Sequence, residues 1–223
     1  MIADTSARRS GGFSPMVMLA VILVGVFSFS AFFTLSAFAP ELTTGRDGRA
    51  HALSTSAVGF AGVVRLARAR GDAVSIGRQP MDPARLESLV VLTPEHPISV
   101  EELDEAAGSA TLVVLPKWAV GPHPTHRGWV SRYSQYDDES LGVLINAIAP
   151  GATFAQAEGE GAVRLNYWEK TSRSSGPIER LQTVSGPNLT PMVTDSAGRA
   201  VLARFDREGF LPIYILADPD FLN

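Results

Sequence analysis

Six side chains that could do chemistry stand directly after three apolar runs of the sequence. A glutamate and a histidine follow residues 89–92, a lysine and a tryptophan follow 111–115, and two aspartates follow the run that begins at 213. Carboxylates and an imidazole can move protons, whereas an ammonium and an indole can hold a ligand. Prolines and aspartates also form turns, which is the simpler explanation for part of this set. We take the six as a candidate ligand or partner rim: Glu95, His96, Lys117, Trp118, Asp218 and Asp220.

Other patterns in the sequence predict no catalytic residue, metal or cofactor. The chain has no cysteine, which excludes a thiol nucleophile, a disulfide scaffold and a cysteine-ligated metal. It also has no G-x-S-x-G elbow, and Ser54 and Ser56 are better explained as helix caps. His123 and His126 are three residues apart in a proline-rich loop, without the carboxylate pair that would complete a metal site.

The elements that would position the rim begin with an alternation of helical and strand patterns between residues 51 and 118. Continuous apolar runs are typical of strands buried on both faces of a parallel sheet. Ligands of such sheets bind at the carboxyl ends of the strands, so we expect the rim to gather at one edge. The predicted elements are a helix from Ser54 or Ser56 to Gly71, a strand at 73–76, a short helix at 83–86, a strand at 88–93, a helix starting at Ser99 and a strand at 111–115.

The second half of the chain predicts an antiparallel edge of the same sheet. A helix is expected at 139–149, ended by Pro150 and Gly151, and the polar segment that follows, up to Pro177, is predicted to be an irregular insertion. Turns are expected at 195–198 and 208–209. The predicted strands lie at 178–184, 192–194, 199–205 and 213–217.

Residues 16–39 form an uncharged run that predicts a transmembrane helix. A cleaved signal peptide is the alternative, because Arg8 and Arg9 precede the run and Ala37-Phe38-Ala39 imitates a cleavage site. The run is longer than a usual signal sequence, and Pro40 fits a peptidase poorly, so we expect an uncleaved single-pass anchor. The expected organisation is a short cytoplasmic tail at 1–15, the membrane helix at 16–39, a linker at 40–50 and an α/β domain at 51–223.

Charge patterning excludes a nucleic-acid partner and gives a direction to the anchor. The chain has a net charge of −4 and no lysine- or arginine-rich stripe. Arg8, Arg9 and the amino terminus stand before the span, against Arg46 and Arg49 after it. This small excess favours a cytoplasmic tail and an exported body.

Five segments resemble the bacterial membrane-anchored family of unknown function numbered 4350. They are 52–60 (ALSTSAVGF), 92–94 (LTP), 113–118 (VVLPKW), 181–184 (LQTV) and 216–220 (LADPD). The resemblance implies a flavodoxin-like, class I glutamine amidotransferase-like three-layer sandwich with a mainly parallel sheet, encoded near a MoxR-type ATPase. It implies no amidotransferase activity, because that chemistry needs a cysteine. Family members commonly have a second span, so either the chain is truncated at Asn223 or the resemblance is incomplete.

Two functions from different classes follow from these observations. The first is a membrane-tethered, non-catalytic binding or assembly domain of a bacterial envelope system, which uses the rim for a small ligand or for other membrane proteins. The second is a hydrolase-like enzyme in which Asp218, Asp220, Glu95 and His96 do acid–base work. We expect the first, because no complete catalytic set is present.

Overall fold

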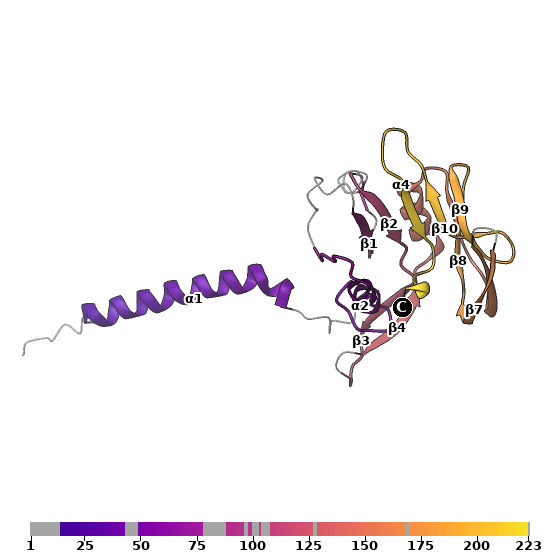
Figure 1. Cartoon of the computed structure of the whole chain (residues 1–223). Coiled ribbons are helices and arrows are strands. Elements are labelled where there is room, and N and C mark those ends of the chain that lie inside the picture. The colour runs from indigo at the N-terminus through magenta and orange to yellow at the C-terminus, as the bar shows by residue number, and fades with distance from the viewer. Residues whose placement is uncertain are drawn as a thin grey trace, which may run out of the picture. The chain divides into compact units, whose positions relative to one another are not determined.

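The computed structural model describes residues 14–42, 49–77, 88–95, 98–99, 103, 108–126, 129–167 and 170–222. The chain divides into two compact units, residues 1–43 and residues 44–223, which we describe separately (Figure 1). We call the second unit the body.

The described part of the first unit is one helix, α1 (Pro15–Leu42). Its segment Pro15–Thr34 is 20 residues long and apolar enough to cross a membrane. At 1.5 Å per residue this segment is about 30 Å long, which matches the hydrocarbon core of a bilayer. The structure therefore confirms the N-terminal apolar helix expected at 16–39. Such a helix suits either a membrane anchor or a signal sequence.

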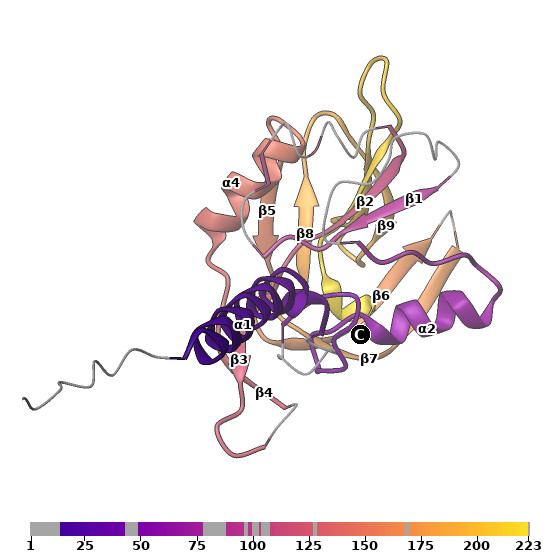
Figure 2. The same cartoon turned by 90° about the vertical axis from the view of Figure 1, so that its left-hand side faces the viewer.

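The body is built on a nine-stranded mixed sheet and a separate two-stranded ribbon (Figure 2). The strand order of the large sheet is β1-β2-β11-β10-β9-β6-β7, and β8 pairs with both β10 and β5. Its strands are β1 (Leu89–Leu92), β2 (Ala110–Val114), β5 (Thr153–Gln156), β6 (Glu160–Tyr167), β7 (Lys170–Glu179), β8 (Gln182–Ser185), β9 (Leu189–Thr194), β10 (Ala200–Phe205) and β11 (Ile213–Leu216). The ribbon pairs β3 (Trp118–Pro122) with β4 (Val130–Gln135). The helices whose full bounds lie within the described residues of the body are α2 (Ala61–Ala69), α4 (Asp138–Ile148) and the 3₁₀ turn η1 (Pro219–Phe221).

Parallel pairing is confined to three neighbouring strands. β1 pairs with β2 and β2 pairs with β11, so the carboxyl ends of all three strands meet at one edge, as expected. The other pairings among the described residues are antiparallel, beginning with β10 on β11. The mixed α/β class is therefore confirmed, but the antiparallel part is larger than the edge that the sequence predicts.

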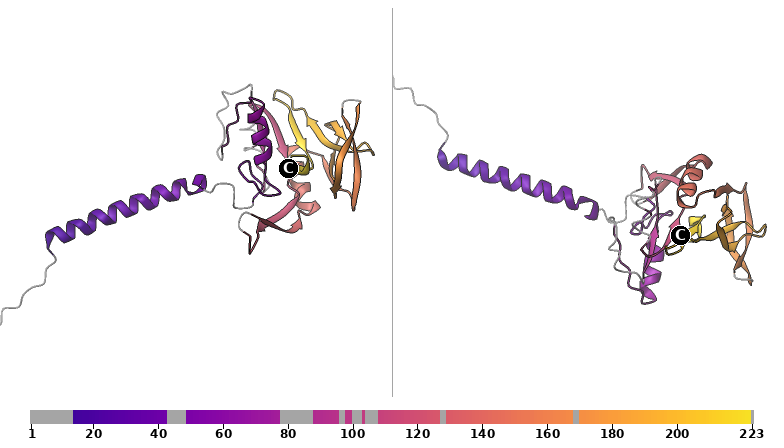
Figure 3. Two further views of the ribbon diagram at one scale, coloured as in Figure 1. Left: turned by 60° about the horizontal axis from the view of Figure 1, so that its bottom comes forward. Right: turned by 90° about the horizontal axis from the view of Figure 1, so that it is seen from above.

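The extra antiparallel strands come from the segment predicted to be an irregular insertion. Residues 153–179 contain β5 and the long hairpin β6–β7, so that prediction was wrong. The hairpin carries many polar residues and no continuous apolar run, which hides its strand character. In Figure 3 this hairpin, coloured orange, lies at the opposite end of the body from α2, coloured purple.

One face of the sheet packs against α4, as the predicted helix at 139–149 requires. Val113 and Ile215 point to this face, and Ile145 of α4 is completely buried against them. Leu141, Leu144 and Ile148 lie at helical spacing from Ile145 and are also buried. Pro150 and Gly151 follow α4, and Gly151 has a φ of 81°, a conformation that favours glycine.

The other face of the sheet carries a smaller cluster. Val114 and Leu216 alternate with the residues that face α4, so they point to the opposite side and pack with Phe60. Ala50, at the start of the described part of the body, packs against the same cluster. The face that α2 adjoins is therefore also the face at which the chain enters the body.

Residues 51–77 differ from the prediction in three ways. The helix begins at Ala61, and its N-cap is Phe60, which makes no side-chain cap. Ser54 and Ser56 are not caps, because they lie in the preceding turn, where their hydroxyls are 2.9 Å apart. Residues 73–76 form no strand. Gly71 ends the helix as expected, with a φ of 92°.

Two other predicted elements fall largely on residues outside the described ranges. The short helix at 83–86 is not described at all. Of the helix predicted to start at Ser99, Leu103 is described, and its N–H donates to the Ser99 carbonyl at 3.1 Å, the spacing of a first helical turn.

The turn predicted at 195–198 is confirmed and joins β9 to β10. Asp195 is buried, and one carboxylate oxygen accepts from the N–H groups of Ala197 and Arg199 at 2.9 Å each. The strand predicted at 178–184 is instead interrupted at Arg180, whose φ of 51° marks the turn between β7 and β8. A pattern of apolar residues does not show such a single-residue turn.

The N-cap of α4 predicts a stability that depends on pH. Asp137 accepts from the backbone N–H of Ser140 at 2.7 Å and from its hydroxyl at 2.9 Å. These hydrogen bonds lower the pKa of the Asp137 carboxyl, so its contribution is present above the ordinary value of 3.8 and is lost as the pH falls through the lowered value. We expect Asp137→Ala to lower the Tm at pH 7, and the difference from wild type to narrow below pH 3.8.

Asp137→Asn is the matched control, because an asparagine oxygen still caps the helix but does not titrate. Melting curves of the two variants, recorded by circular dichroism at several pH values, make the comparison. A deficit of Asp137→Ala that stays constant down to the acid-unfolding range would contradict this role of the carboxylate.

Candidate functional site

A buried ion cluster joins the carboxyl ends of β2 and β11. The Nζ atom of Lys117 lies 2.8 Å from Oδ2 of Asp218 and 2.7 Å from Oδ2 of Asp220. The side chains of Lys117 and Asp218 are fully buried, and that of Asp220 is 30% exposed. We call these three residues the lysine clasp.

Asp218 uses both carboxylate oxygens inside the fold. Oδ2 also accepts from the backbone N–H of Gln182 at 3.0 Å, and Oδ1 accepts from the backbone N–H of Asp220 at 3.0 Å. Burial raises the pKa of the Asp218 carboxyl, and the Lys117 ammonium opposes this rise. Asp218 thus connects β2, β8, β11 and η1. Both of its carboxylate oxygens are used in hydrogen bonds within the fold, so its role is structural.

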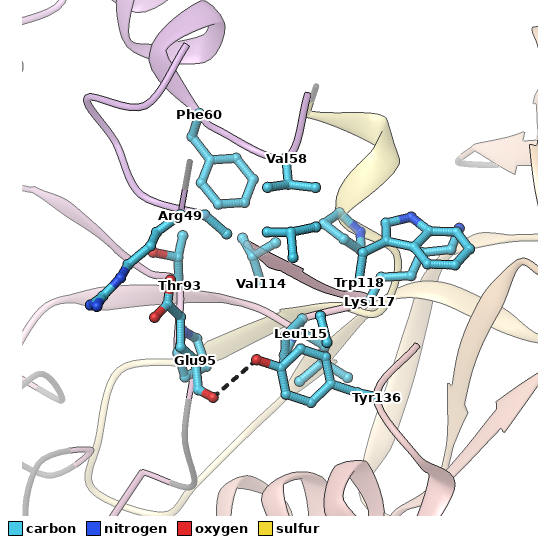
Figure 4. Close-up of a pocket in the computed structure, with 16 residues that line it drawn as sticks. Arg49, Val58, Phe60, Thr93, Glu95, Val114, Leu115, Lys117, Trp118 and Tyr136 are labelled. Atoms are coloured by element: carbon cyan, nitrogen blue, oxygen red, sulfur yellow. Dashed lines mark hydrogen bonds between the residues drawn. The ribbon is translucent and has the colours of Figure 1, made fainter. Parts of the chain in front are cut away.

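A cavity of about 300 Å³ opens above the lysine clasp, at the carboxyl ends of β1 and β2 (Figure 4). Most of its wall is apolar, which is typical of small-molecule sites. Its polar side chains come from separate segments of the chain, from Arg49 at the start of the described body to Tyr136 after β4. The residues that line it are Arg49, Ala50, Val58, Phe60, Thr93, Pro94, Glu95, Val114, Leu115, Pro116, Lys117, Trp118, Ala119, Val120, Tyr136 and Pro219.

Tyr136 and Glu95 form the polar side of this pocket. The Tyr136 hydroxyl donates to the backbone carbonyl of Glu95 at 3.3 Å, and the Tyr136 N–H donates to the carbonyl of Lys117 at 3.1 Å. Burial, followed by the nearby Glu95 carboxylate, raises the pKa of the Tyr136 phenol, so the hydroxyl remains a donor at neutral pH. The pocket therefore offers one carboxylate beside one neutral hydroxyl, and Arg49 and Thr93 are further polar residues of its lining.

Trp118 is held in place by a cation on its ring. The Arg132 guanidinium lies 4.0 Å from the ring centroid, and Arg132 is itself paired with Glu179 at 2.8 Å. The Lys117 ammonium lies 5.6 Å from the same centroid. These contacts hold the indole at the start of β3, and Trp118 is one of the residues that line the pocket.

The structure brings most of the predicted rim together, but in two different roles. Glu95, Lys117 and Trp118 all line the pocket. Asp218 and Asp220 lie behind it and neutralise Lys117. His96 lies outside the described residues.

Sequence reasoning did not assign three pocket residues that come from other elements. Phe60 and Val58 belong to the turn before α2, and Tyr136 follows β4. For Phe60 and Val58 the signal is Gly59 between them. A Cβ at this position would collide with the backbone of Ser54, so the glycine marks a tight turn there. For Tyr136 the signal is its place in an aromatic-rich stretch after the strand end, with Trp118, Trp129 and Tyr133.

The described residues contain no group of three or more metal-binding side chains. The pair His123 and His126 lies in the loop between β3 and β4, with the two Nδ1 atoms 3.3 Å apart. Thr125 hydrogen-bonds to His126 at 2.9 Å and contributes no metal-binding carboxylate. The pair is explained by the hydrogen bonds of the loop itself.

Comparison with known proteins gives no family and no activity. No family model matches the chain, and neither does any curated protein sequence. Among solved structures, an exo-β-1,4-mannosidase, Op5Man5 from Opitutaceae bacterium strain TAV5, is 15% identical with a TM-score of 0.42, over 72% of this chain and 26% of the mannosidase. A β-galactosidase from the psychrophilic Marinomonas ef1 is 15% identical with a TM-score of 0.35, over 60% of this chain and 18% of that enzyme. The chain thus spans about a quarter or less of the proteins it matches.

The lysine clasp predicts a large stability loss when one partner is removed. Lys117→Met leaves the Asp218 carboxylate buried without its cation, and we expect this to cost about 3–5 kcal/mol of unfolding free energy. Denaturant titration followed by circular dichroism measures the loss.

The exposed pair Arg204–Asp206 provides the control, because its atoms are 2.7 Å apart but its side chains are 46% and 54% exposed. Arg204→Ala should have a much smaller effect on the unfolding free energy, because water screens an ion pair on the surface. If Lys117→Met costs no more than Arg204→Ala, the clasp does not stabilise the body.

Proposed function

We propose that this chain is a membrane-tethered, non-catalytic binding domain of a bacterial envelope system, which holds a small ligand in the pocket at the strand ends. The observation that carries the proposal is that the charged residues beside this pocket have two different environments. The charges of Lys117 and Asp218 are paired and buried, whereas Glu95 and Tyr136 line a cavity of about 300 Å³ whose wall is partly apolar. Such a site can orient a ligand without providing paired acid and base groups.

The alternative function is a hydrolase-like enzyme, and its main candidate residue, Asp218, is already paired within the lysine clasp. General acid–base catalysis needs a carboxylate within hydrogen-bonding reach of the substrate. Asp218 is fully buried, and its oxygens accept from Lys117, Gln182 and Asp220. Glu95 is the carboxylate that lines the pocket among the described residues. A single carboxylate fits ligand recognition better than a two-carboxylate hydrolysis.

The membrane tether is the second part of the proposal. α1 has the length and composition of a single span, and Arg8, Arg9 and the amino terminus favour a cytoplasmic tail with a periplasmic body on the inner membrane. The resemblance to family 4350 supports the same arrangement. It adds the expectation of a flavodoxin-like, amidotransferase-like fold for the body and of partners among membrane proteins of a MoxR-type ATPase cluster.

Ligand binding predicts a thermal shift that depends on the pocket. A panel of small amines, amino acids, sugars and carboxylates is screened against the full chain in detergent. A ligand at one hundred times its Kd stabilises the folded state by about 2.7 kcal/mol, which is well within detection. We expect at least one class to raise the Tm, and the shift to disappear in Val58→Trp, which fills the cavity, and to weaken in Glu95→Gln.

Val143→Trp is the matched control, because Val143 is 56% exposed on α4, away from the pocket. This variant should retain the shift. A panel that stabilises Val58→Trp as much as wild type would overturn the pocket assignment. Conversion of the bound compound, detected by chromatography and lost in Glu95→Gln, would overturn the non-catalytic assignment.

The proposed membrane anchor predicts that the chain keeps its N-terminal helix in cells and that its body is exported. Intact-mass spectrometry of the membrane fraction should give a chain that retains residues 16–39, since an anchor is not cleaved. A phosphatase reporter fused after Asn223 should be active only when it is exported, and we expect activity. A mature chain that begins near residue 40, or a reporter active only in the cytoplasm, would contradict the anchor or its direction respectively.

A further inference from the structure

We propose that α2 rests on the surface of an anionic phospholipid bilayer and orients the body on its membrane. This inference rests on the proposed membrane tether and adds an interaction surface to it. We call Arg65, Leu66, Arg68 and Arg70 the arginine face; the first three belong to α2, and Arg70 caps its end.

The arginine face combines exposed positive charge with an exposed apolar side chain. Ala61 of α2 is buried and Val64 is partly buried, whereas all four residues of the arginine face are exposed. Leu66 is 63% exposed, a high value for a leucine on a short amphipathic helix. None of the three arginines forms an ion pair with a residue that the structure describes. Arginine with an adjacent leucine is the chemistry that recognises phospholipid headgroups at a membrane interface.

Helix stability alone does not explain this charge. A cation near the carboxyl end of a helix interacts favourably with the helix dipole, which accounts for Arg68 and Arg70. Arg65 lies in the middle of α2, where the dipole gives no such benefit. Leu66, one residue later, gains nothing from the dipole at all. An external anionic and partly apolar surface accounts for all four residues.

The two helices α2 and α4 carry net charges of opposite sign. Residues 61–72 carry three arginines and Asp72, a net charge of +2 (3 − 1). α4 with its N-cap, on the opposite face, carries Asp137, Asp138 and Glu139 and no basic residue, a net charge of −3. The two helices also lie well apart in the view of Figure 2. An anionic surface therefore attracts the α2 side of the body and repels the α4 side.

The tether delivers the α2 side of the body to the membrane. The eight residues that follow α1, 43–50, span at most about 30 Å even when fully extended. Ala50 packs in the same cluster as Phe60, the N-cap of α2. The chain thus enters the body beside the start of α2. Under the proposed tether, the length of the linker limits the distance between this point and residue 42. This high local concentration compensates for the short length of α2.

The absence of cysteine from the chain allows a direct test in the full-length protein. Leu66→Cys carries a fluorescent label, and the protein is reconstituted in nanodiscs that contain a headgroup-linked quencher. The lipid is phosphatidylcholine alone, or phosphatidylcholine with about 30% phosphatidylglycerol. We expect quenching of the label to be strong in the anionic nanodiscs, and to fall by at least about fivefold when Arg65→Glu and Arg68→Glu are added or when salt is raised to about 0.5 M.

A label at Val143→Cys on α4 is the matched control and should be quenched weakly in both lipids. Arg65→Lys with Arg68→Lys retains the charge and should retain the quenching, and unchanged melting curves confirm that the variants fold. Equal quenching at position 66 in both lipids, or none in either, overturns the inference. Protection of the label that rises with protein concentration instead assigns the face to a second copy and also overturns it.

Failure of the tether gives a different result from failure of the arginine face. A chain that does not insert through α1 never enters the nanodisc fraction, which overturns the proposed anchor. A chain that inserts but leaves position 66 unquenched overturns only the arginine face. Ligand-induced thermal shifts are measured on the same preparations and report on the pocket independently.

Discussion

The pairing of Lys117 with Asp218 is the interaction on which the rest of the body depends. Residues 117 and 218 are far apart in sequence, yet they follow the adjacent parallel strands β2 and β11. A buried cation needs an anion at short range, because desolvation of either charge alone costs several kcal/mol. The clasp therefore fixes the register at which the ends of these strands meet. Gln182 donates to the same carboxylate, so β8 is fixed by the same interaction.

The clasp also decides what kind of site stands above it. A free ammonium at the floor of the pocket would attract anions, but Asp218 and Asp220 neutralise it at 2.8 and 2.7 Å. The character of the cavity is then set by its other polar lining residues beside the apolar side chains. These polar residues are Arg49, Thr93, Glu95 and Tyr136. Lys117, Asp218 and Asp220, which suggest catalysis in the sequence, thus form ion pairs with one another and do not act on a ligand.

Prediction from the sequence succeeded where the chain has a continuous apolar run. The expected burial on both faces was wrong for β1, because β1 is an edge strand in which Leu89 and Val91 are 55% and 51% exposed. The strands that contain Val91, Val113 and Ile215 and the helix around Ile145 were all expected, and so was the meeting of strand ends at one edge. It failed for the hairpin β6–β7, whose residues lack such a run. For the site, strand-end position predicted that Lys117 and Asp218 approach each other. It could not predict that they neutralise each other, because side-chain geometry over such a separation is set by packing, nor that Phe60 and Tyr136 complete the wall.

The position of β11 in the middle of the sheet has a consequence for how the body is made. β11 forms the junction between the parallel strands β1 and β2 and the antiparallel remainder, and it is followed directly by the aspartates of the clasp. Until residues 213–220 have been synthesised, the chain lacks both the central strand and the partners of Lys117. The sheet must close late, through contacts of high sequence separation, which are slow to form. While residues 213–220 are still missing, the Lys117 ammonium therefore stays in water and the edges of β2 and β10 that β11 covers stay unpaired.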